Sequence, residues 1–176
     1  MRKLITNIAI LAGLDTEHKL RLAGKDMSHF DTLDNAWLLM EDGKFKAWGK
    51  MSEMPADGIT AEERIDAKGG CVMPSWCDPH THIVFAGSRE AEFVDKICGL
   101  SYTEIAKRGG GILNSADLLH TLTEDELYRA AKHRAEEIML KGTGCVEIKS
   151  GYGLTTDDEL KMLRVIRRLK ENTPLR

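Results

Sequence analysis

The 176 residues contain only four cysteines. No two of them form a Cys-x2-Cys pair, and none has a histidine partner at zinc-finger spacing, so the sequence excludes a zinc ribbon or zinc finger. We expect all four to be buried or half-buried thiols of a protein that works in a reducing cytoplasm. They are Cys71, Cys77, Cys98 and Cys145.

The chain also lacks an excess of positive charge and any long apolar run. Its net charge is −3, with 42% hydrophobic and 30% charged residues, which is typical of a globular protein. This balance predicts no nucleic-acid partner. No stretch approaches the ~20 apolar residues of a membrane helix, so no membrane partner is predicted. Residues 4–11 resemble a signal peptide, but Thr6 and Asn7 interrupt them, which favours a β-strand.

Short strands are predicted over residues 1–68. Residues 4–11 and 64–67 are two candidates. Residues 37–40 and 45–48 flank Asp42-Gly43, a dipeptide that suits a type I′ hairpin turn. Strands this few cannot close a core, so we expect a small sheet that further strands complete.

Strand and helix alternate after Gly70, which predicts parallel β/α units. Residues 71–84 are expected to form the first strand with its loop, and residues 145–149 the next strand. Ser101 and Thr123 each precede a glutamate by three residues, the capping-box spacing that opens a helix. The first helix should end at Gly109 and the second at Gly142.

A last helix is predicted from residue 156 onward. Thr156 is the expected cap, and Leu160, Leu163, Ile166 and Leu169 fall at helical spacing. Met139, Met162 and Leu163 are assigned to core stripes.

Two histidines, His80 and His82, stand at positions i and i+2 near the end of the first predicted strand of the second region. Because successive side chains of a strand alternate between its faces, both imidazoles point the same way, with Thr81 opposed and Asp78 on their own face. Two neutral imidazoles side by side make half of a metal site. Strand-end histidines that merely hydrogen-bond to neighbours are the alternative.

The segment Gly-Gly-Cys-Val-Met-Pro-Ser-Trp-Cys-Asp-Pro-His-Thr-His resembles the first barrel strand of the metal-dependent amidohydrolase superfamily. Several motifs further along the chain resemble one family of this superfamily, the imidazolonepropionases. This closer resemblance extends from about residue 71 to residue 169. Ser75 departs from the pattern, where glycine is expected after the proline. The motifs are Val-Phe-Ala-Gly-Ser-Arg at 84–89, Ala-Glu-Phe at 91–93, Gly-Gly-Gly-Ile at 109–112, Val-Glu-Ile-Lys-Ser-Gly-Tyr-Gly-Leu at 146–154 and Glu-Leu-Lys-Met-Leu-Arg at 159–164.

This resemblance implies a fold, an activity and a cofactor. The expected class is α/β: residues 69–176 would be the first β/α units of a (β/α)8 TIM barrel, and residues 1–68 part of a composite β-sandwich built from both chain ends. The implied reaction is hydrolysis of the cyclic amide 4-imidazolone-5-propanoate, a small-molecule substrate, to N-formimino-L-glutamate in histidine degradation. One divalent metal, Zn²⁺ or Fe, would bind His80 and His82, and the full-length enzyme would be a homodimer.

The resemblance also assigns substrate contacts. Arg89 would bind the propionate, because a guanidinium binds a carboxylate through two parallel hydrogen bonds; a salt-bridged surface arginine beside Glu90 and Glu92 is the alternative. Tyr152, between two glycines after a strand, is expected to contact substrate, as is Tyr102. A loop tyrosine packed on the next helix is the alternative for Tyr152.

Other conspicuous residues are interpreted as structural. Lys149 could suggest the carbamylated lysine of two-metal amidohydrolases, but its neighbours match the single-metal type. Glycines 109–111 lack the ending of a phosphate loop and are expected to be a flexible connection near the site. His120 and His133 are expected on helix surfaces, and His18 and His29 in polar loops.

Length limits what this chain can do alone. A complete (β/α)8 barrel needs roughly 250 residues, so these 176 residues are expected to be an N-terminal fragment that is inactive and self-associates by itself. The remaining metal ligands and the catalytic acid and base would lie beyond residue 176. Two other functions stay open: another amidohydrolase, such as a guanine or cytosine-type deaminase, or a non-catalytic fragment.

Overall fold

The computed structural model describes residues 1–15, 17 and 19–176, so His18 lies outside the described residues. The chain forms two compact units, Met1–Pro74 and Ser75–Arg176. The division falls six residues later than the boundary drawn from the sequence after residue 68, because the strand at Cys71 pairs within the first unit.

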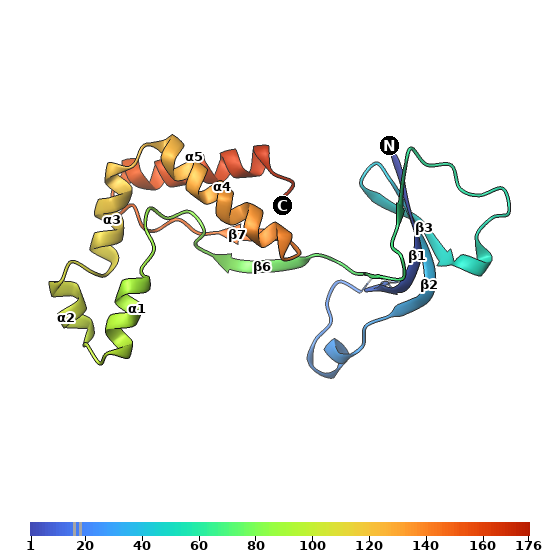
Figure 1. Ribbon diagram of the computed structural model, residues 1–176, viewed down its shortest axis with the longest axis horizontal. Helices are drawn as coiled ribbons and strands as arrows, with labels where there is room; N and C mark the ends of the chain where they lie inside the picture. Colours follow the sequence, from blue (N-terminus) through green and yellow to red (C-terminus); the bar gives the residue numbers. More distant parts are fainter. Residues whose placement is uncertain (16, 18) are drawn as a thin grey trace. The chain divides into compact units, whose positions relative to one another are not determined.

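The first unit is built on one five-stranded sheet in the order β3-β2-β1-β4, with β5 also paired to β1 (Figure 1). The β1–β2 and β2–β3 pairs are antiparallel, whereas β4 and β5 run parallel to β1. Two short 3₁₀ helices, η1 (Gly24–Ser28) and η2 (Met51–Glu53), lie in its connections. The strands are β1 (Arg2–Ala12), β2 (Thr32–Glu41), β3 (Lys44–Lys50), β4 (Glu63–Asp66) and β5 (Cys71–Val72).

The predicted hairpin is confirmed at the turn between β2 and β3. Asp42 and Gly43 have φ values of +50° and +76°, the left-handed conformation that a type I′ turn requires at both central positions. The strands predicted near residues 4–11 and 64–67 are also present, as β1 and β4.

A bulge in β1 changes which of its residues face each side of the sheet. The register of β1 against β2 shifts between Ile5 and Ile8, where Asn7 has a φ of +54°. Residues four apart on a regular strand share a face, but the bulge places Leu4 and Ile8 in different clusters. Leu4 packs with Trp37, Leu39 and Ile59, and Ile8 packs with Leu11, Ala36 and Leu38.

The second unit pairs two parallel strands, β6 (Trp76–Thr81) and β7 (Thr143–Ile148), and carries five helices. The chain is therefore mixed α/β. Figure 1 shows α4 and α5 side by side along the strand pair, and both α4–α5 and α4–β7 are in contact. The helices are α1 (Glu90–Ile97), α2 (Tyr102–Lys107), α3 (Ile112–Thr121), α4 (Glu124–Leu140) and α5 (Thr156–Asn172).

The strand predicted over residues 71–84 is two strands in the structure. Cys71 and Val72 form β5 in the first unit, and the strand of the second unit begins at Trp76. Pro74 lies between them, and proline cannot donate to a strand ladder, so the pairing is interrupted there.

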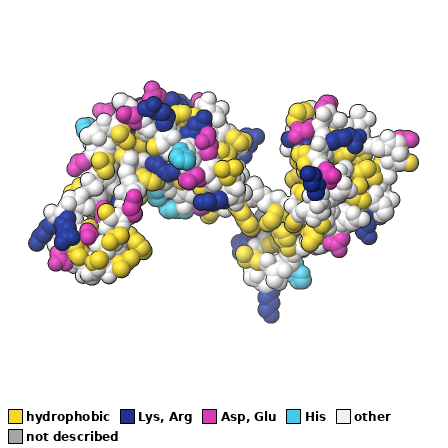
Figure 2. Space-filling view, viewed as in Figure 1, with side chains coloured by type: hydrophobic (Ala, Val, Ile, Leu, Met, Phe, Trp, Pro, Cys, Tyr) yellow, Lys and Arg dark blue, Asp and Glu magenta, His cyan; other side chains and the backbone are white. Residues whose placement is uncertain are grey.

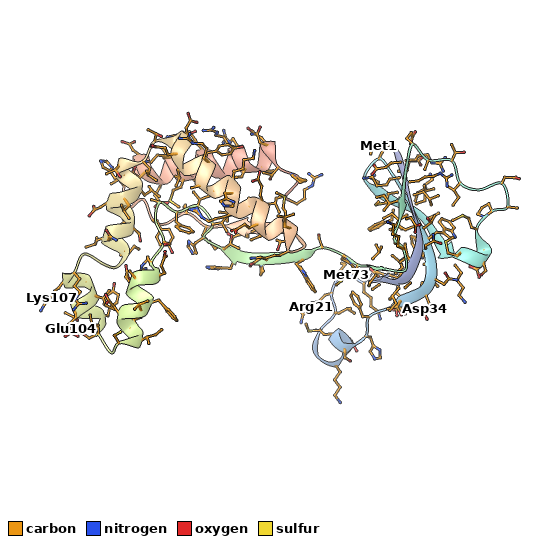
Figure 3. The ribbon with its side chains drawn as sticks, viewed as in Figure 1. Met1, Arg21, Asp34, Met73, Glu104 and Lys107 are labelled. Atoms are coloured by element: carbon orange, nitrogen blue, oxygen red, sulfur yellow. The ribbon has the colours of Figure 1, made fainter. Side chains whose placement is uncertain are left out.

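Two of the three predicted helix caps are confirmed. Ser101 caps α2 and Thr123 caps α4, each in a complete capping box, and Figure 3 labels Glu104 of the first box on α2. The third prediction is wrong by one residue: Thr155, not Thr156, caps α5, and its hydroxyl accepts a hydrogen bond from the Asp158 N–H at 3.2 Å. The cap is the threonine that stands three residues before Asp158.

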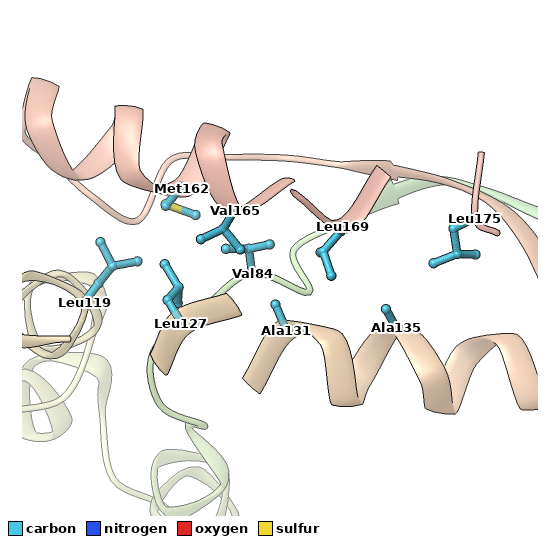
Figure 4. Packing of buried hydrophobic residues seen from close by; sticks show 9 residues of the cluster. All are labelled: Val84, Leu119, Leu127, Ala131, Ala135, Met162, Val165, Leu169 and Leu175. Carbon is cyan, nitrogen blue, oxygen red and sulfur yellow. The ribbon is translucent and has the colours of Figure 1, made fainter. Parts of the chain in front are cut away.

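The main core of the second unit lies between α4 and α5. Figure 4 shows Leu127, Ala131 and Ala135 of α4 facing Met162, Val165 and Leu169 of α5, with Val84 and Leu119 against them. Leu160 and Leu163 were predicted to share the buried stripe of α5, but they are 47% and 50% exposed. The buried face runs through residues 158, 162, 165 and 169 instead, because α5 turns that side toward α4.

A cluster of polar contacts around the buried Asp158 carboxylate joins α3 to α5. Asp158 is 4% exposed and binds Lys161 Nζ at 2.9 Å and His120 Nδ1 at 2.9 Å. Lys161 also donates to the carbonyl oxygens of Leu119 and Leu122, which end α3. The Lys161 and His120 hydrogen bonds lower the pKa of Asp158 well below its usual range.

Three of the four thiols are not buried as expected. Cys71, Cys77 and Cys98 are exposed, and Cys145 is half-buried. Cys77 and Cys145 are register partners on β6 and β7. Among the described residues, this sheet has only these two strands. Among these residues, no helix is long and apolar enough to cross a membrane. Acidic and basic side chains are interspersed on the surface of both units (Figure 2).

Met162 and Leu163 provide a matched test of the assigned core face. Met162→Ala should lower the free energy of unfolding by roughly 2–5 kcal/mol, because Met162 is fully buried. Leu163→Ala, at the half-exposed neighbour, should cost far less. Chemical denaturation of both variants measures the difference. Equal losses would mean that α5 buries a different face.

Candidate functional site

The two histidines of the His-x-His motif lie side by side at the end of β6. Their ring centroids are 5.4 Å apart. Thr81, between them, turns the other way: its hydroxyl donates to the Glu147 carbonyl of β7 at 2.7 Å, and its own carbonyl accepts from the Lys149 N–H at 2.8 Å. These bonds hold the strand end so that the imidazoles share a side.

The two imidazoles differ in their surroundings. His80 is exposed, and its backbone N–H donates to Asp78 Oδ1 at 3.2 Å. His82 is half-buried against the Tyr152 ring, with centroids 5.1 Å apart. Its Nδ1 atom is buried and has no hydrogen-bond partner among the described residues. A buried polar atom without a partner is costly, so this nitrogen is suited to a ligand or a partner outside these residues.

A pocket of about 230 Å³ opens beside His82. It brings together residues from the end of β6, the loop that follows, α3 and the loop after β7. Three of its polar side chains were singled out in the sequence: His82, Arg89 and Tyr152. The lining residues are His82, Phe85, Gly87, Ser88, Arg89, Ser115 and Tyr152.

Arg89 lies in the pocket and is also ion-paired, with Glu92 one turn further along. Its pKa is raised, first by the hydrogen bond with Glu92 and to a lesser degree by Tyr152 and Tyr102. Its Nε atom is buried without a partner among the described residues, so the guanidinium keeps an unsatisfied donor.

A single carboxylate holds the loop that presents Tyr152. Glu159 Oε1 accepts from the Gly153 N–H at 2.7 Å and the Leu154 N–H at 3.3 Å, while Oε2 accepts from the Gly151 N–H at 2.9 Å. Burial alone would raise the pKa of Glu159, but the hydrogen bonds from Ser150 and these N–H groups outweigh it and lower the pKa. The loop is therefore fixed around an ionised side chain.

Gly153 has no room for a side chain at this loop. A Cβ there would lie 2.6 Å from the Glu159 nitrogen and 2.7 Å from the Asp158 carbonyl carbon. The second glycine beside Tyr152 is thus required by the close approach of α5.

Three residues discussed from the sequence lie outside the pocket lining: the site candidates Tyr102 and His80, and Lys149, which was interpreted as structural. Tyr102 is 61% exposed on the first turn of α2, with its phenol directed at Gly111, where an added Cβ would be 3.4 Å away. Lys149 is half-exposed and pairs with Glu147 at 2.9 Å. His80 does not line the pocket itself but adjoins His82.

Three contributors to the site were not predicted from the sequence. Phe85 lines the pocket and is held by Arg134 of α4, whose guanidinium lies 3.6 Å from the ring centroid and donates to the Phe85 carbonyl at 2.7 Å. Ser115 comes from α3, a helix that was not predicted. One feature of the sequence could have pointed to Glu159 as a residue that holds the loop. It stands in the first turn of a predicted helix, directly after a loop that contains glycines.

The described residues contain no group of three or more His, Cys, Asp or Glu side chains placed to hold a metal ion. The metal-ligand pattern in this part of the chain is the pair His80 and His82. Adjacent imidazoles, one with an unpartnered buried nitrogen, fit a ligand pair for a divalent transition metal.

Known proteins match this sequence over nearly its whole length, although no family model matches it. It is 53% identical over 175 residues, 99% of the chain, to an imidazolonepropionase from Christiangramia forsetii. It is 52% identical over 176 residues to one from Flavobacterium psychrophilum, and 43% identical over 177 residues to one from Syntrophobacter fumaroxidans. The chain belongs to the imidazolonepropionase family.

The chain spans about two fifths of the length of these imidazolonepropionases: 42% of the first two and 41% of the third.

Solved structures agree at the level of the fold. A metal-dependent hydrolase from Pyrococcus furiosus has a TM-score of 0.55 at 14% identity, covering 99% of this chain and 48% of its own. A guanine deaminase from C. acetobutylicum has a TM-score of 0.52 at 16% identity, covering 96% of this chain and 34% of its own. The chain therefore has an amidohydrolase-type α/β fold.

Glu159→Gln should loosen the Tyr152 loop and destabilise the protein by roughly 1.5–3 kcal/mol, as for hydrogen bonds to a charged group. Because the folded-state pKa of Glu159 is lowered, its contribution is complete above its unfolded pKa of about 4.3 and disappears as the pH falls through the folded value. Denaturation midpoints of the two proteins should therefore differ most near pH 7 and converge as the pH falls through the lowered pKa of Glu159. A constant gap across this range would contradict the role of the charge.

Proposed function

We propose that this chain provides the substrate anchor and two metal ligands of an enzyme that hydrolyses 4-imidazolone-5-propanoate to N-formimino-L-glutamate. The observation that carries the proposal is the convergence of His82, Arg89 and Tyr152 on one pocket, in a chain of the imidazolonepropionase family. In the reaction, water adds to the ring carbonyl, the amide C–N bond breaks and the ring nitrogen takes a proton.

His80 and His82 are the proposed metal ligands. A bound divalent metal, Zn²⁺ or Fe, would supply activation of water by lowering the pKa of that water toward about 7. Catalytic metal sites commonly have about three protein ligands, so at least one more is proposed on a segment outside this chain, together with the acid and base. The rigid pairing of Thr81 with β7 keeps both imidazoles on one side, which favours joint binding.

Arg89 and Tyr152 would orient the substrate. Arg89 retains donors after its pairing with Glu92, and a propionate carboxylate is the natural acceptor for them. Tyr152 lines the same pocket and packs against His82, so its ring can cover the imidazolone while the tail reaches Arg89. Tyr102, whose phenol contributes to the electrostatics of Arg89, is proposed as an outer substrate contact.

The finer architecture supports the same assignment. The order β6, helices, β7, α5 with parallel strands supports the first β/α units of a TIM barrel, which we propose for the second unit, Ser75–Arg176, in place of the range 69–176 expected from the sequence. Active sites of such barrels lie at carboxyl ends of strands, where His80, His82 and Tyr152 lie. The first unit is proposed as part of a composite β-sandwich, and the complete enzyme as a homodimer.

The metal ligands can be tested in the complete enzyme. His80→Ala combined with His82→Ala should abolish metal retention, because both imidazoles of the pair are removed. His120→Ala is the matched control, since His120 binds Asp158 and lies outside the pocket lining. Elemental analysis after dialysis measures the metal. Undiminished metal in the double variant would sink the assignment.

Arg89 is tested by its effect on substrate binding. Arg89→Ala should lower kcat/KM by about ten- to hundredfold, the value of a lost charge-assisted hydrogen bond of roughly 1.5–3 kcal/mol, with metal content intact. The same variant distinguishes the proposed function from that of a deaminase. A flat purine or pyrimidine base has no carboxylate for Arg89 to bind, so its loss should matter little to a deaminase. Wild-type kinetics on imidazolonepropanoate would show that Arg89 is not the anchor. A complete enzyme without metal or turnover would support a non-catalytic role.

A further inference from the structure

One carboxylate joins the Arg89 loop to the start of α3. Glu92 Oε2 pairs with Arg89 Nη2, and Glu92 Oε1 accepts the Gly111 N–H at 2.8 Å. The Glu92 side chain is only 12% exposed. Both of its oxygens are therefore engaged, one by a pocket side chain and the other by the backbone at the N-terminus of a helix that also lines the pocket.

The glycine run at 109–111 is shaped to receive this carboxylate. A Cβ on Gly110 would lie 3.1 Å from Glu92 Cδ and 2.7 Å from Ile105 Cγ2, and Gly111 has a φ of +90°. Gly111 is also buried. The run was expected to be a flexible connection, but these contacts make it a fitted turn whose backbone N–H points at Glu92.

The charge on Glu92 is maintained in this setting. Its pKa is lowered, first by the hydrogen bond from Arg89 and then by that from the Gly111 N–H. An ionised Glu92 holds the guanidinium by a charge-assisted hydrogen bond, which is directional as well as strong. Arg89 is thus presented to the pocket in one orientation rather than sampling the many rotamers of a free arginine.

The same contact places Ser115. Gly111 is the residue before α3, and Ser115 lies four residues later, with its hydroxyl directed back at the Gly111 carbonyl at 3.5 Å. Ser115 is 7% exposed and lines the pocket. By binding Gly111, Glu92 sets the start of the turn that carries Ser115 and so fixes two pocket walls together.

We propose that Glu92 is a positioning residue that orients Arg89 for a substrate carboxylate and locks it to the α3 wall of the pocket. The inference rests on the proposed function and deepens it, because it assigns recognition of the anionic tail to an Arg89–Glu92–Gly111 unit rather than to Arg89 alone. Glu92 does not itself touch the substrate. Its loss should act through Arg89.

The test is a mutant cycle in the complete enzyme. Glu92→Ala should raise KM for imidazolonepropanoate about tenfold with a smaller change in kcat, and Glu92→Asp should restore part of the loss. In the Arg89→Ala background, Glu92→Ala should add little, because the residue it positions is gone. Glu90→Ala is the matched control on the first turn of the same helix; Glu90 is exposed and should leave the kinetics unchanged. Thermal melting of each variant accompanies the kinetics.

Calorimetric binding of 3-(imidazol-4-yl)propanoate, which keeps the ring and tail but has no hydrolysable amide, provides a readout independent of turnover. Glu92→Ala should weaken this binding about tenfold. A lowered Tm with unchanged KM and binding, or losses additive with those of Arg89→Ala, would overturn the positioning role. If the unsubstituted enzyme binds this compound but does not hydrolyse imidazolonepropanoate, the proposed reaction is refuted, and the binding of the Glu92 variants still tests the positioning role. If the unsubstituted enzyme does not bind the compound, the proposed reaction and the positioning role are both refuted.

Discussion

The parallel pairing of β6 with β7 is the constraint on which the site depends. It places the end of a strand that carries two histidines beside the loop that carries Tyr152, although the two segments are far apart in the sequence. Two hydrogen bonds of Thr81 at the end of the strand pair do this directly. Its hydroxyl donates to the Glu147 carbonyl, and its own carbonyl accepts from the Lys149 N–H. Without them, neither the imidazole pair nor the tyrosine would have a fixed place.

Half-buried carboxylates then hold the polar groups of the pocket. Glu92 binds Arg89 and the start of α3, and Glu159 binds three backbone N–H groups of the Tyr152 loop. In both cases an ionised side chain accepts hydrogen bonds from backbone N–H groups at or next to glycine, where no side chain blocks the approach. Loops that present functional side chains are usually the least ordered parts of a fold, and these contacts supply the order that orientation requires.

The helices behind the pocket are joined by packing and by charge. Leu127, Ala131 and Ala135 of α4 meet Met162, Val165 and Leu169 of α5, and small alanines let the two helices approach closely. Arg164 and Arg168 add ion pairs to Glu124 and Asp125 at the solvent edge of the same contact. Because α5 begins directly after the Tyr152 loop and carries Glu159, its anchoring on α4 also anchors the loop.

Local sequence by itself determined the hairpin at Asp42-Gly43, the caps at Ser101 and Thr123 and the shared side of His80 and His82. Each depends on interactions within a few residues: a left-handed turn, a side chain reaching its own helix start, and the alternation of a strand. The family motifs also identified Arg89 and Tyr152. The sequence predictions were wrong for the cap of α5, which is Thr155 rather than Thr156, and for Leu160 and Leu163, which lie off its buried face. Neighbours distant in the chain decide which face of a helix is covered.

Only the tertiary structure decided how the pocket is closed. It placed Ser115 and Phe85 beside His82, engaged Glu92 with both Arg89 and Gly111, and divided residues 71–84 between two sheets at Pro74. These outcomes rest on contacts between segments far apart in sequence, whose energies depend on which backbone N–H or apolar surface arrives opposite. Hydrophobic periodicity and helix or strand propensity describe only neighbouring residues and do not predict contacts between distant segments. The sequence therefore indicated candidate residues of the pocket but not the residues that they contact.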